Sequence, residues 1–244
     1  MDKLFRLNGK IAIVTGGNSG IGEGIAHGLA MAGANVVIAA RDQEKTSRSV
    51  RNIEQQHGVR ALGVQVDVSR KSAIEAMVDS TLSAFGAIDV LVNNAGINIR
   101  KMPQDFSTVE WDDVVNTNLR GTFLCCQSAY PAMRERGGKI INIGSLASIF
   151  GSMKTAAYAS SKGGIVQLTR SLAVAWAADN IQVNAILPGW IDTPLTQGSR
   201  KAFPGLDQHV EQRCPAGRWG TPADFAGPSI FLASDASDFV TGES

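Results

Sequence analysis

Short apolar stretches rich in β-branched residues alternate along the chain with longer segments in which apolar residues recur every three or four positions. The short stretches predict strands, and they cover residues 10–15, 35–40, 61–66, 88–92, 139–144 and 181–187. The longer segments predict helices over residues 21–32, 42–57, 71–85, 108–136 with a break near Asn116, and 155–178. Because the strands are almost continuously apolar, we expect helices on both faces of a parallel sheet with right-handed crossovers.

This order of elements predicts an α/β protein with a single Rossmann-like, doubly wound domain over residues 1–244. No long linker or low-complexity segment interrupts it. A break at Pro188-Gly189 follows the last predicted strand, and residues 195–215 have weak periodicity and several turn-forming residues. We therefore expect a mobile substrate flap at about residues 190–215 rather than a second domain.

Composition and charge argue against several functional classes. The chain has 23 Lys and Arg against 22 Asp and Glu, a net charge of +1, and no basic tract that would indicate nucleic acid or a membrane surface as a partner. No apolar run approaches the roughly 20 residues that span a bilayer, and residues 1–6 lack the apolar stretch of a signal peptide, so we expect a cytoplasmic protein. No metal site is expected, because ligand spacing is missing among Cys125, Cys126, Cys214, His27, His57 and His209.

A glycine-rich loop, TGGNSGIG at residues 15–22, stands between the first predicted strand and the first predicted helix. Gly16 permits a tight turn, Gly20 lets the backbone approach a phosphate, and Gly22 lets helix and strand pack closely. Free N–H groups at the helix start would then face a pyrophosphate. Many glycine-rich loops are only turns, but this placement favours a dinucleotide site.

The end of the second predicted strand bears on the choice between NADP and NAD. Arg41 is suited to a ribose 2′-phosphate, whereas the neighbouring Asp42 could bind a free 2′-hydroxyl. Asp42 also suits the N-cap of the next helix. We favour the cap for Asp42 and NADP as the cofactor, with NAD as the alternative.

Tyr158 and Lys162 are one helical turn apart, so their side chains leave the same face of a helix. A tyrosine titrates near pH 10, and a neighbouring ammonium favours the phenolate and lowers that pKa. Such a pair suits proton exchange with an alcohol or ketone oxygen, although the same spacing also occurs in ordinary surface pairs.

Together these features resemble the short-chain dehydrogenase/reductase family, and the resemblance covers nearly the whole chain. The matching positions are the loop at residues 15–22, Asp67 with Val68, residues 93–96, Asn118, Ser145, Tyr158 with Lys162, and Pro188, Gly189 and Thr193. Members usually continue past Gly242 into a seventh strand, whereas this sequence ends at Ser244, so the resemblance leaves that sheet edge and its subunit contacts open.

The resemblance implies a catalytic set. Tyr158 would exchange a proton with the substrate oxygen, and Ser145 would hydrogen-bond and position that oxygen. Lys162 would lower the tyrosine pKa and hold the nicotinamide ribose, and Asn118 would orient a water that connects Lys162 to solvent. The implied cofactor-binding set comprises Gly16, Ser19, Gly20, Ile21, Gly22, Arg41, Asp67, Val68, Asn94, Ala95, Gly96, Tyr158, Lys162, Pro188, Gly189, Ile191 and Thr193.

Two further segments, residues 98–101 and 215–220, resemble the sugar-acid dehydrogenases of the family that act on gluconate and 2-deoxygluconate. A sugar acid is therefore the expected small-molecule substrate, with Arg100 binding its carboxylate and Trp190 bordering the site. The similar 3-oxoacyl carrier-protein reductases are the alternative. A non-catalytic cofactor-binding regulator is disfavoured because all four catalytic residues are present.

The predicted helices at residues 122–133 and 155–178 carry apolar residues around much of their circumference. A helix that is apolar on more than one face buries the second face against a partner. Since family members commonly pair these helices across a two-fold axis, we expect a homotetramer.

Overall fold

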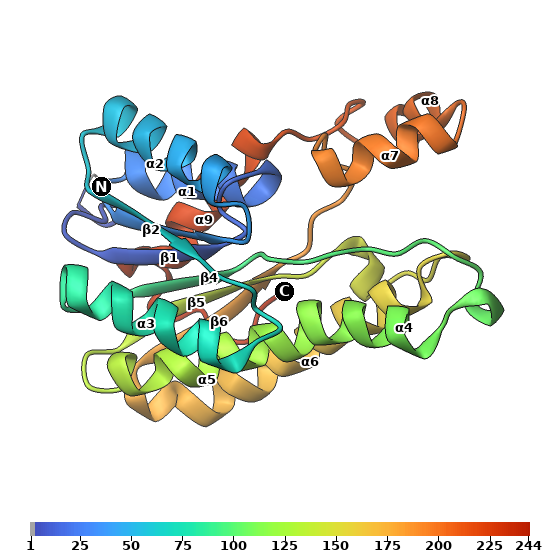
Figure 1. Ribbon diagram of the computed structural model, residues 1–244. Helices are drawn as coiled ribbons and strands as arrows, with labels where there is room; N and C mark the ends of the chain where they lie inside the picture. The colour runs from blue at the N-terminus through green and yellow to red at the C-terminus, as the bar shows by residue number, and fades with distance from the viewer. Residues whose placement is uncertain (1–2) are drawn as a thin grey trace.

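The computed structural model describes residues 3–244, so the first two residues of the N-terminal segment considered above lie outside it. A six-stranded, wholly parallel sheet with the order β3-β2-β1-β4-β5-β6 forms the centre of the molecule (Figure 1). Its strands are β1 (Ile11–Thr15), β2 (Asn35–Ala40), β3 (Ala61–Gln65), β4 (Val90–Asn93), β5 (Gly138–Ile143) and β6 (Ile181–Ile186). The doubly wound α/β fold predicted from the alternation is thereby confirmed.

Helices cover both faces of the sheet (Figure 1). Apolar side chains of one face pack on α3 (Lys71–Phe85), α5 (Gly121–Met133) and α6 (Ala156–Trp176), and those of the other face pack on α1 (Gly20–Met31), α2 (Gln43–His57) and α9 (Ala226–Ala233). The strands are apolar on both sides for this reason: in β1, Ile13 belongs to the first core, and Ala12 and Val14 belong to the second. Each large side chain that is fully buried in this way contributes about 1.5–3 kcal/mol to stability.

Near Asn116, where a break was predicted, the helix is irregular but not interrupted. After α4 (Thr108–Val115) the helix widens into a π-helical turn, Asn116–Arg120, before it continues as α5. A π-turn inside a helix often marks a functional position, because it redirects side chains that a regular helix would present elsewhere.

The segment that the sequence left without regular elements forms two short helices, α7 (Pro194–Ala202) and α8 (Leu206–Arg213). They lie beyond the carboxyl ends of the strands, away from the two helical layers (Figure 1). Gly205, at a φ of 83°, makes the turn between them. Helix α9, which the sequence did not predict, follows and returns the chain to the sheet. None of the helices in the described residues is long and apolar enough to cross a membrane.

The last residues of the chain bind along β6. The Gly242 N–H donates to the Val183 carbonyl at 2.8 Å, and the Ala185 N–H donates to the Glu243 carbonyl, also at 2.8 Å. The Asn184 side chain donates to the Val240 carbonyl at 2.8 Å. These bonds occupy backbone groups of β6, the strand at the end of the sheet order.

Candidate active site

The carboxyl ends of β1 and β4 form the crevice at which the strand order reverses, which is where open parallel sheets bind ligands. The side-chain amide of Asn94, just after β4, donates to the carbonyls of Thr15 at 3.0 Å and Gly16 at 3.2 Å. Gly16 has a φ of 65°, and a Cβ there would lie 2.8 Å from the Asn94 amide nitrogen. A side chain at this turn would therefore push the loop away from the sheet.

Helix α1 begins at Gly20, and Ser19 at its N-cap makes no side-chain capping bond. The N–H groups of its first turn are thus left for a ligand, and the positive end of the helix favours a phosphate. A Cβ at Gly20 would lie 3.2 Å from Thr193, so the backbone of α1 closely approaches the segment that follows β6.

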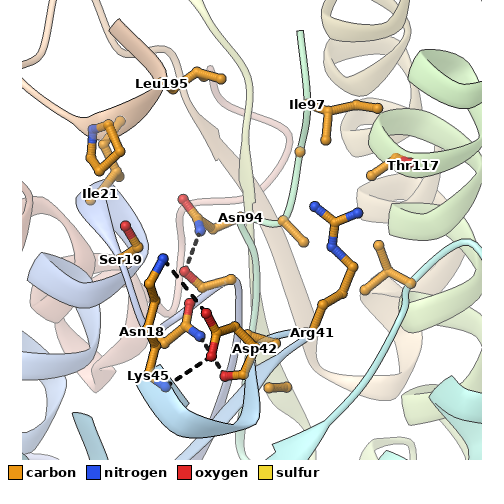
Figure 2. Close-up of a pocket in the computed structure, with 18 of the residues that line it drawn as sticks. Asn18, Ser19, Ile21, Arg41, Asp42, Lys45, Asn94, Ile97, Thr117 and Leu195 are labelled. Carbon is orange, nitrogen blue, oxygen red and sulfur yellow. Dashed lines mark hydrogen bonds and ion pairs between the residues drawn. The ribbon is translucent and has the colours of Figure 1, made fainter. Parts of the chain in front are cut away.

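A cleft of about 550 Å³ opens in front of this helix (Figure 2). Eleven of the predicted cofactor residues line it: Gly16, Ser19, Gly20, Ile21, Arg41, Asp67, Val68, Asn94, Ala95, Gly96 and Thr193. Gly22 lies behind the cleft and packs against Gly16, as a helix–strand packing glycine should. The cleft's size, its phosphate-binding helix start and its basic end fit a dinucleotide.

Sequence reasoning missed several residues that line this cleft, among them Asn18, Lys45, Ile97, Asn98, Thr117 and Leu195. Two of them stand beside motifs that were recognised, since Asn18 lies inside the glycine-rich loop and Thr117 precedes Asn118. Leu195 lies on α7 and Lys45 on α2, and both line the cleft because of how these helices pack. No local sequence pattern predicts that position.

The side chains of Arg41 and Asp42 make different contacts in this cleft. Asp42 is the N-cap of α2: its carboxylate accepts the Lys45 N–H at 3.0 Å and pairs with the Lys45 ammonium at 3.6 Å. The backbone hydrogen bond from Lys45 lowers the pKa of Asp42. Arg41 extends into the cleft with its guanidinium near the side that carries Thr117 (Figure 2), and it forms no ion pair within residues 3–244. The cap interpretation of Asp42 is confirmed.

Asp67 follows β3 and also lines the cleft. Burial raises its pKa, but hydrogen bonds from the N–H and hydroxyl of Ser69, at 3.0 and 2.8 Å, and the charge of Arg41 outweigh burial, so the pKa is lowered overall. The carboxylate is therefore ionised at neutral pH and holds its loop in place.

A second, smaller cleft of about 100 Å³ adjoins the first and shares Ile21, Asn94, Gly96, Thr193 and Leu195 with it. Three of the predicted catalytic residues meet here, because Ser145 follows β5 and Tyr158 and Lys162 come from α6, and the loop after β6 also lines this cleft. That loop contributes Pro188, Gly189 and Ile191.

Lys162 is almost fully buried, and its ammonium donates to the Ile143 carbonyl at 2.6 Å. Burial lowers the pKa of Lys162 from 10.5 to about 8. Its nitrogen lies 5.8 Å from the centroid of the Tyr158 ring, so the pair does share one side of the cleft.

The pKa of Tyr158 is raised in this structure rather than lowered, and Lys162 is not among the groups that oppose the effect of burial. Burial raises the pKa of Tyr158, and the groups that oppose this effect are the Ser145 hydroxyl and the positive charge of Arg100. Burial of the ring outweighs both of these groups.

Asn118 lies in the π-helical turn and is fully buried. Its side chain exchanges two hydrogen bonds with the backbone of Ile97, accepting the N–H at 2.8 Å and donating to the carbonyl at 2.9 Å. A Cβ at Gly96 would lie 3.1 Å from the Asn118 oxygen and 3.7 Å from the Lys162 nitrogen. The asparagine thus fixes the loop after β4 and lies close to the lysine, although it lines neither cleft.

The two predicted substrate residues lie beside the clefts rather than in their walls. Arg100 is half-buried, and burial lowers its pKa while Tyr158 opposes this, so the guanidinium and the phenol lie within electrostatic reach of each other. Lys101 pairs with Glu110 instead of adding charge to the site. Trp190 packs edge-on against Trp219 with ring centroids 5.6 Å apart.

The clefts therefore combine a phosphate-binding helix start with a phenol, a hydroxyl and an ammonium where a nicotinamide would end. This set can move a proton at an oxygen while a hydride moves at the attached carbon. Within residues 3–244, no three His, Cys, Asp or Glu side chains are grouped to hold a metal ion.

Comparison with known proteins agrees with this arrangement. Residues 16–244 match the protein-family model described as Enoyl-(Acyl carrier protein) reductase. The chain is 42% identical over 241 residues to 2-dehydro-3-deoxy-D-gluconate 5-dehydrogenase of Escherichia coli (strain K12), covering 98% of this chain and 93% of that protein. It is 35% identical to a 3-oxoacyl carrier-protein reductase of Aquifex aeolicus (strain VF5), covering 98% and 96%.

Among solved structures, the chain resembles a gluconate 5-dehydrogenase from Burkholderia cenocepacia J2315 in complex with NADP and tartrate. The TM-score is 0.94 at 38% identity, and the alignment covers 99% of this chain and 94% of that one.

Proposed function

The chain belongs to the short-chain dehydrogenase/reductase family, and we propose that it interconverts a secondary alcohol and a ketone of a sugar acid with NADP as hydride carrier. The observation that carries this proposal is the convergence of Ser145, Tyr158 and Lys162 on a small cleft that adjoins the dinucleotide cleft. The 2-dehydro-3-deoxy-D-gluconate 5-dehydrogenase relatives and the gluconate 5-dehydrogenase structure support a sugar acid.

NADP, when bound, supplies or accepts a hydride at C4 of its nicotinamide. Tyr158 gives a proton to the ketone oxygen in reduction and takes it back in oxidation, and Ser145 holds that oxygen by a hydrogen bond. Lys162 binds the nicotinamide ribose and keeps positive charge near the phenol. Asn118 holds the loop after β4 through Ile97 and stands next to Lys162, where an ordered water would link the lysine to solvent.

The proposed cofactor contacts follow the cleft. The N-terminus of α1 with Ser19, Gly20 and Ile21 holds the pyrophosphate, and Asp67 with Val68 borders the adenine. The nicotinamide half lies against residues shared by the two clefts and against the loop that carries Pro188, Gly189 and Ile191.

A substrate panel tests this function. Sugar acids, uncharged polyols and ketones, and 3-oxoacyl thioesters should be compared with NADP(H) and NAD(H) by nicotinamide fluorescence. We expect the highest kcat/KM for a sugar acid with NADP(H). Turnover confined to acyl thioesters would overturn the sugar-acid assignment, and no turnover of any ketone or alcohol would overturn the enzyme assignment.

A 3-oxoacyl carrier-protein reductase is the second candidate. The Aquifex aeolicus relative supports it, as do apolar side chains exposed on the segment that follows Ser145, namely Ile149, Phe150 and Met153. An apolar acyl chain could pack against these side chains, whereas a polar sugar acid would gain nothing from them. The panel above separates the two candidates.

We propose that Arg41 selects NADP. Arg41→Ala should raise the KM for NADPH by about ten- to 150-fold and change the KM for NADH little, because a charged hydrogen bond to the 2′-phosphate contributes about 1.5–3 kcal/mol. Initial rates with each cofactor measure this effect.

Arg70→Ala is the matched control for Arg41→Ala. Arg70 also lies close enough to lower the pKa of Asp67, but it does not line the cleft. The control should leave both KM values near those of the unmodified chain. Equal effects of Arg41→Ala on NADPH and NADH would show that another group governs cofactor choice.

We propose that Arg100 binds the substrate carboxylate. Arg100→Ala should lower kcat/KM for a sugar acid by about ten- to 150-fold, since a planar guanidinium pairs with a carboxylate at about 1.5–3 kcal/mol. A neutral ketone of similar size should lose less, and what it loses reports the influence of Arg100 on the pKa of Tyr158.

Lys101→Ala is the control for that comparison, because the Lys101 ammonium is already paired with Glu110. It should leave the preference for sugar acids intact. Equal losses on charged and neutral substrates in Arg100→Ala would rule out carboxylate recognition and favour the acyl-reductase alternative.

We propose a homotetramer built on α5 and α6. The supporting observation is that both helices leave apolar side chains exposed on the face away from the sheet, with Phe123 39% and Val174 82% exposed. Light scattering at micromolar protein should give a mass near four times 25.8 kDa. A stable monomer at that concentration would contradict the proposal.

We propose further that residues 1–244 act as one domain whose mobile flap, at about residues 190–215, consists of α7 and α8. We also propose that the protein is cytoplasmic and has no nucleic-acid or membrane partner. Three observations support these proposals. One sheet organises the chain, α7 and α8 lie apart from its helical layers, and the net charge is +1. Hydrogen exchange should show α7 and α8 exchanging faster than α5.

A further inference from the structure

We propose that Arg200 is a positioning residue that fastens α7 and α8 to the rim of the nucleotide cleft and so sets the affinity for NADPH. The inference rests on the proposed function in taking this cleft as the cofactor site. It concerns a residue that touches neither cleft and that no motif of the sequence indicates.

Arg200, on α7, contacts three other segments at once. One guanidinium nitrogen, Nη1, lies 2.9 Å from the Asp192 carboxylate in the loop after β6. Nε lies 2.8 Å from the Asp207 carboxylate on α8, an ion pair in which Nε makes no hydrogen bond. The guanidinium carbon lies 3.9 Å from the centroid of the Trp219 ring. A planar guanidinium can pair along its edge and stack on its face at the same time, which an ammonium cannot do.

Trp219 depends on this stacking. Its ring is only 8% exposed, and its indole N–H is buried without a hydrogen-bond partner among the described residues. Packing therefore holds the ring, with the Arg200 guanidinium on its face and the Trp190 ring edge-on to it. A cation on the face of an indole is favourable, and more so where water is excluded.

The contacts of Arg200 lead directly to the cleft. Asp192 lies between Ile191 and Thr193, both of which line the smaller cleft. Its backbone N–H donates to the Gly220 carbonyl at 2.9 Å, next to Trp219. The Thr196 hydroxyl, in the first turn of α7, donates to the Ile191 carbonyl at 2.6 Å.

The rim of the cleft is therefore fixed at two points on α7, by Thr196 at its start and by Arg200 one turn later. Leu195, which lines both clefts, lies between the loop and these two anchors. Loss of the Arg200 contacts would remove the second of these anchors, so Leu195 and Thr193 would cover the cofactor less of the time.

The contacts are also suited to release. The side chains of Asp192 and Asp207 are 45% and 60% exposed, and ion pairs at such positions are individually weak. Three weak contacts made by one side chain can hold the two helices while the cofactor is bound and still let them open for exchange.

Arg200→Gln tests the proposal, because it keeps a polar side chain but removes the charge and the planar fork. We expect the Kd for NADPH, from fluorescence titration, to rise about tenfold, which corresponds to about 1.4 kcal/mol. The single-turnover rate of hydride transfer at saturating NADPH should stay within about twofold, so the loss appears in binding and KM rather than in the chemical step. Arg200→Lys, which keeps the charge without the flat face, should rescue the affinity only in part.

Arg60→Gln is the matched control. Arg60 also stacks on an aromatic ring, at 4.6 Å from the Phe85 centroid, and also hydrogen-bonds a neighbouring segment through the Ala84 carbonyl. It lies outside both clefts and should leave the Kd unchanged. Arg200→Gln could raise the Kd through a general loss of stability, which a lower melting temperature than that of Arg60→Gln would reveal. Asp207→Asn covers this case, because it removes only the partner on α8 and should still raise the Kd for NADPH.

Limited proteolysis separates this inference from the proposed function, because it needs no cofactor. Chymotrypsin should cleave after Phe203, which is 44% exposed in the turn between α7 and α8, faster in Arg200→Gln than in the unmodified chain or in Arg60→Gln. Equal cleavage rates, or an unchanged Kd in a chain that binds NADPH, would overturn the role of Arg200. An unmodified chain that binds no NADPH would overturn the proposed function while the cleavage rates still decide whether Arg200 holds the two helices.

Discussion

Tyr158→Phe is expected to lower kcat by about 10²–10⁴-fold and to leave the Kd for NADPH within about twofold. The substitution removes only the hydroxyl that we propose exchanges a proton with the substrate oxygen, and the phenyl ring keeps the shape of the cleft. Steady-state rates with a sugar acid, together with NADPH titration by fluorescence, measure both quantities.

Tyr130→Phe provides the control, because Tyr130 is the second of only two tyrosines in the chain. Its hydroxyl donates to Asp179 at 2.8 Å at the far end of α6, away from both clefts. This variant should keep normal turnover. Near-normal kcat in Tyr158→Phe, under conditions in which the chemical step limits the rate, would show that another group exchanges the proton.

The raised pKa of Tyr158 gives this experiment a second readout. Because burial favours the neutral phenol, Tyr158 is protonated at neutral pH and ready to donate in ketone reduction. In the reverse direction it must first lose that proton, so oxidation should speed up as the pH rises towards the tyrosine pKa. Both trends should vanish from the residual activity of Tyr158→Phe.

The sheet was predictable because its signals are local. Runs of β-branched residues placed all six strands within two residues of their observed ends, and strand–helix alternation fixed the parallel topology. The resemblance to the family likewise rested on short motifs, and the comparisons confirm it. Helices α7, α8 and α9 were missed because each is only eight or nine residues long and α7 and α9 also contain proline and glycine, so packing rather than a local pattern determines them.

Motifs predicted many of the residues that line the two clefts, but they did not predict the electrostatics there. Motifs identified Tyr158 and Lys162, but the sign of the tyrosine shift depends on how deeply each ring and ammonium is buried, which only the fold decides. The pairing of Lys101 with Glu110 and of Asn118 with Ile97 depends on the path of the loop after β4. A spacing rule places residues on one face of a helix, but it does not show what covers that face.

Lys162→Met is the second substitution from which we expect a large effect. It should lower kcat by about 10²-fold or more and also weaken NADPH binding, because in the proposed mechanism Lys162 supplies both the charge near Tyr158 and a donor to the nicotinamide ribose. The unbranched methionine keeps the apolar stem of the lysine, so packing against α6 and β5 is retained. Lys139→Met is the control: Lys139 is also buried, but its ammonium pairs with Asp238 at 2.7 Å outside the clefts.

The pH dependence of the same variant isolates the lysine. Burial lowers the pKa of Lys162 from 10.5 to about 8, so between these values the unfolded chain binds a proton that the folded chain does not. The free energy of unfolding should therefore contain a contribution that rises with pH above about 8 and that Lys162→Met lacks. Urea unfolding of both proteins at pH 7.5 and 9.5 measures the difference.

Catalysis should follow the opposite trend. In the proposed mechanism the ammonium is the form that keeps positive charge beside the phenol and binds the ribose, so kcat/KM for ketone reduction should fall as the free enzyme passes through pH 8. In Lys162→Met this fall should disappear, leaving a low and flatter profile. An unchanged pH profile in Lys162→Met would show that another group causes the fall in activity at alkaline pH. Normal turnover with only weaker cofactor binding would show that Lys162 acts on the ribose alone and not on the proton transfer.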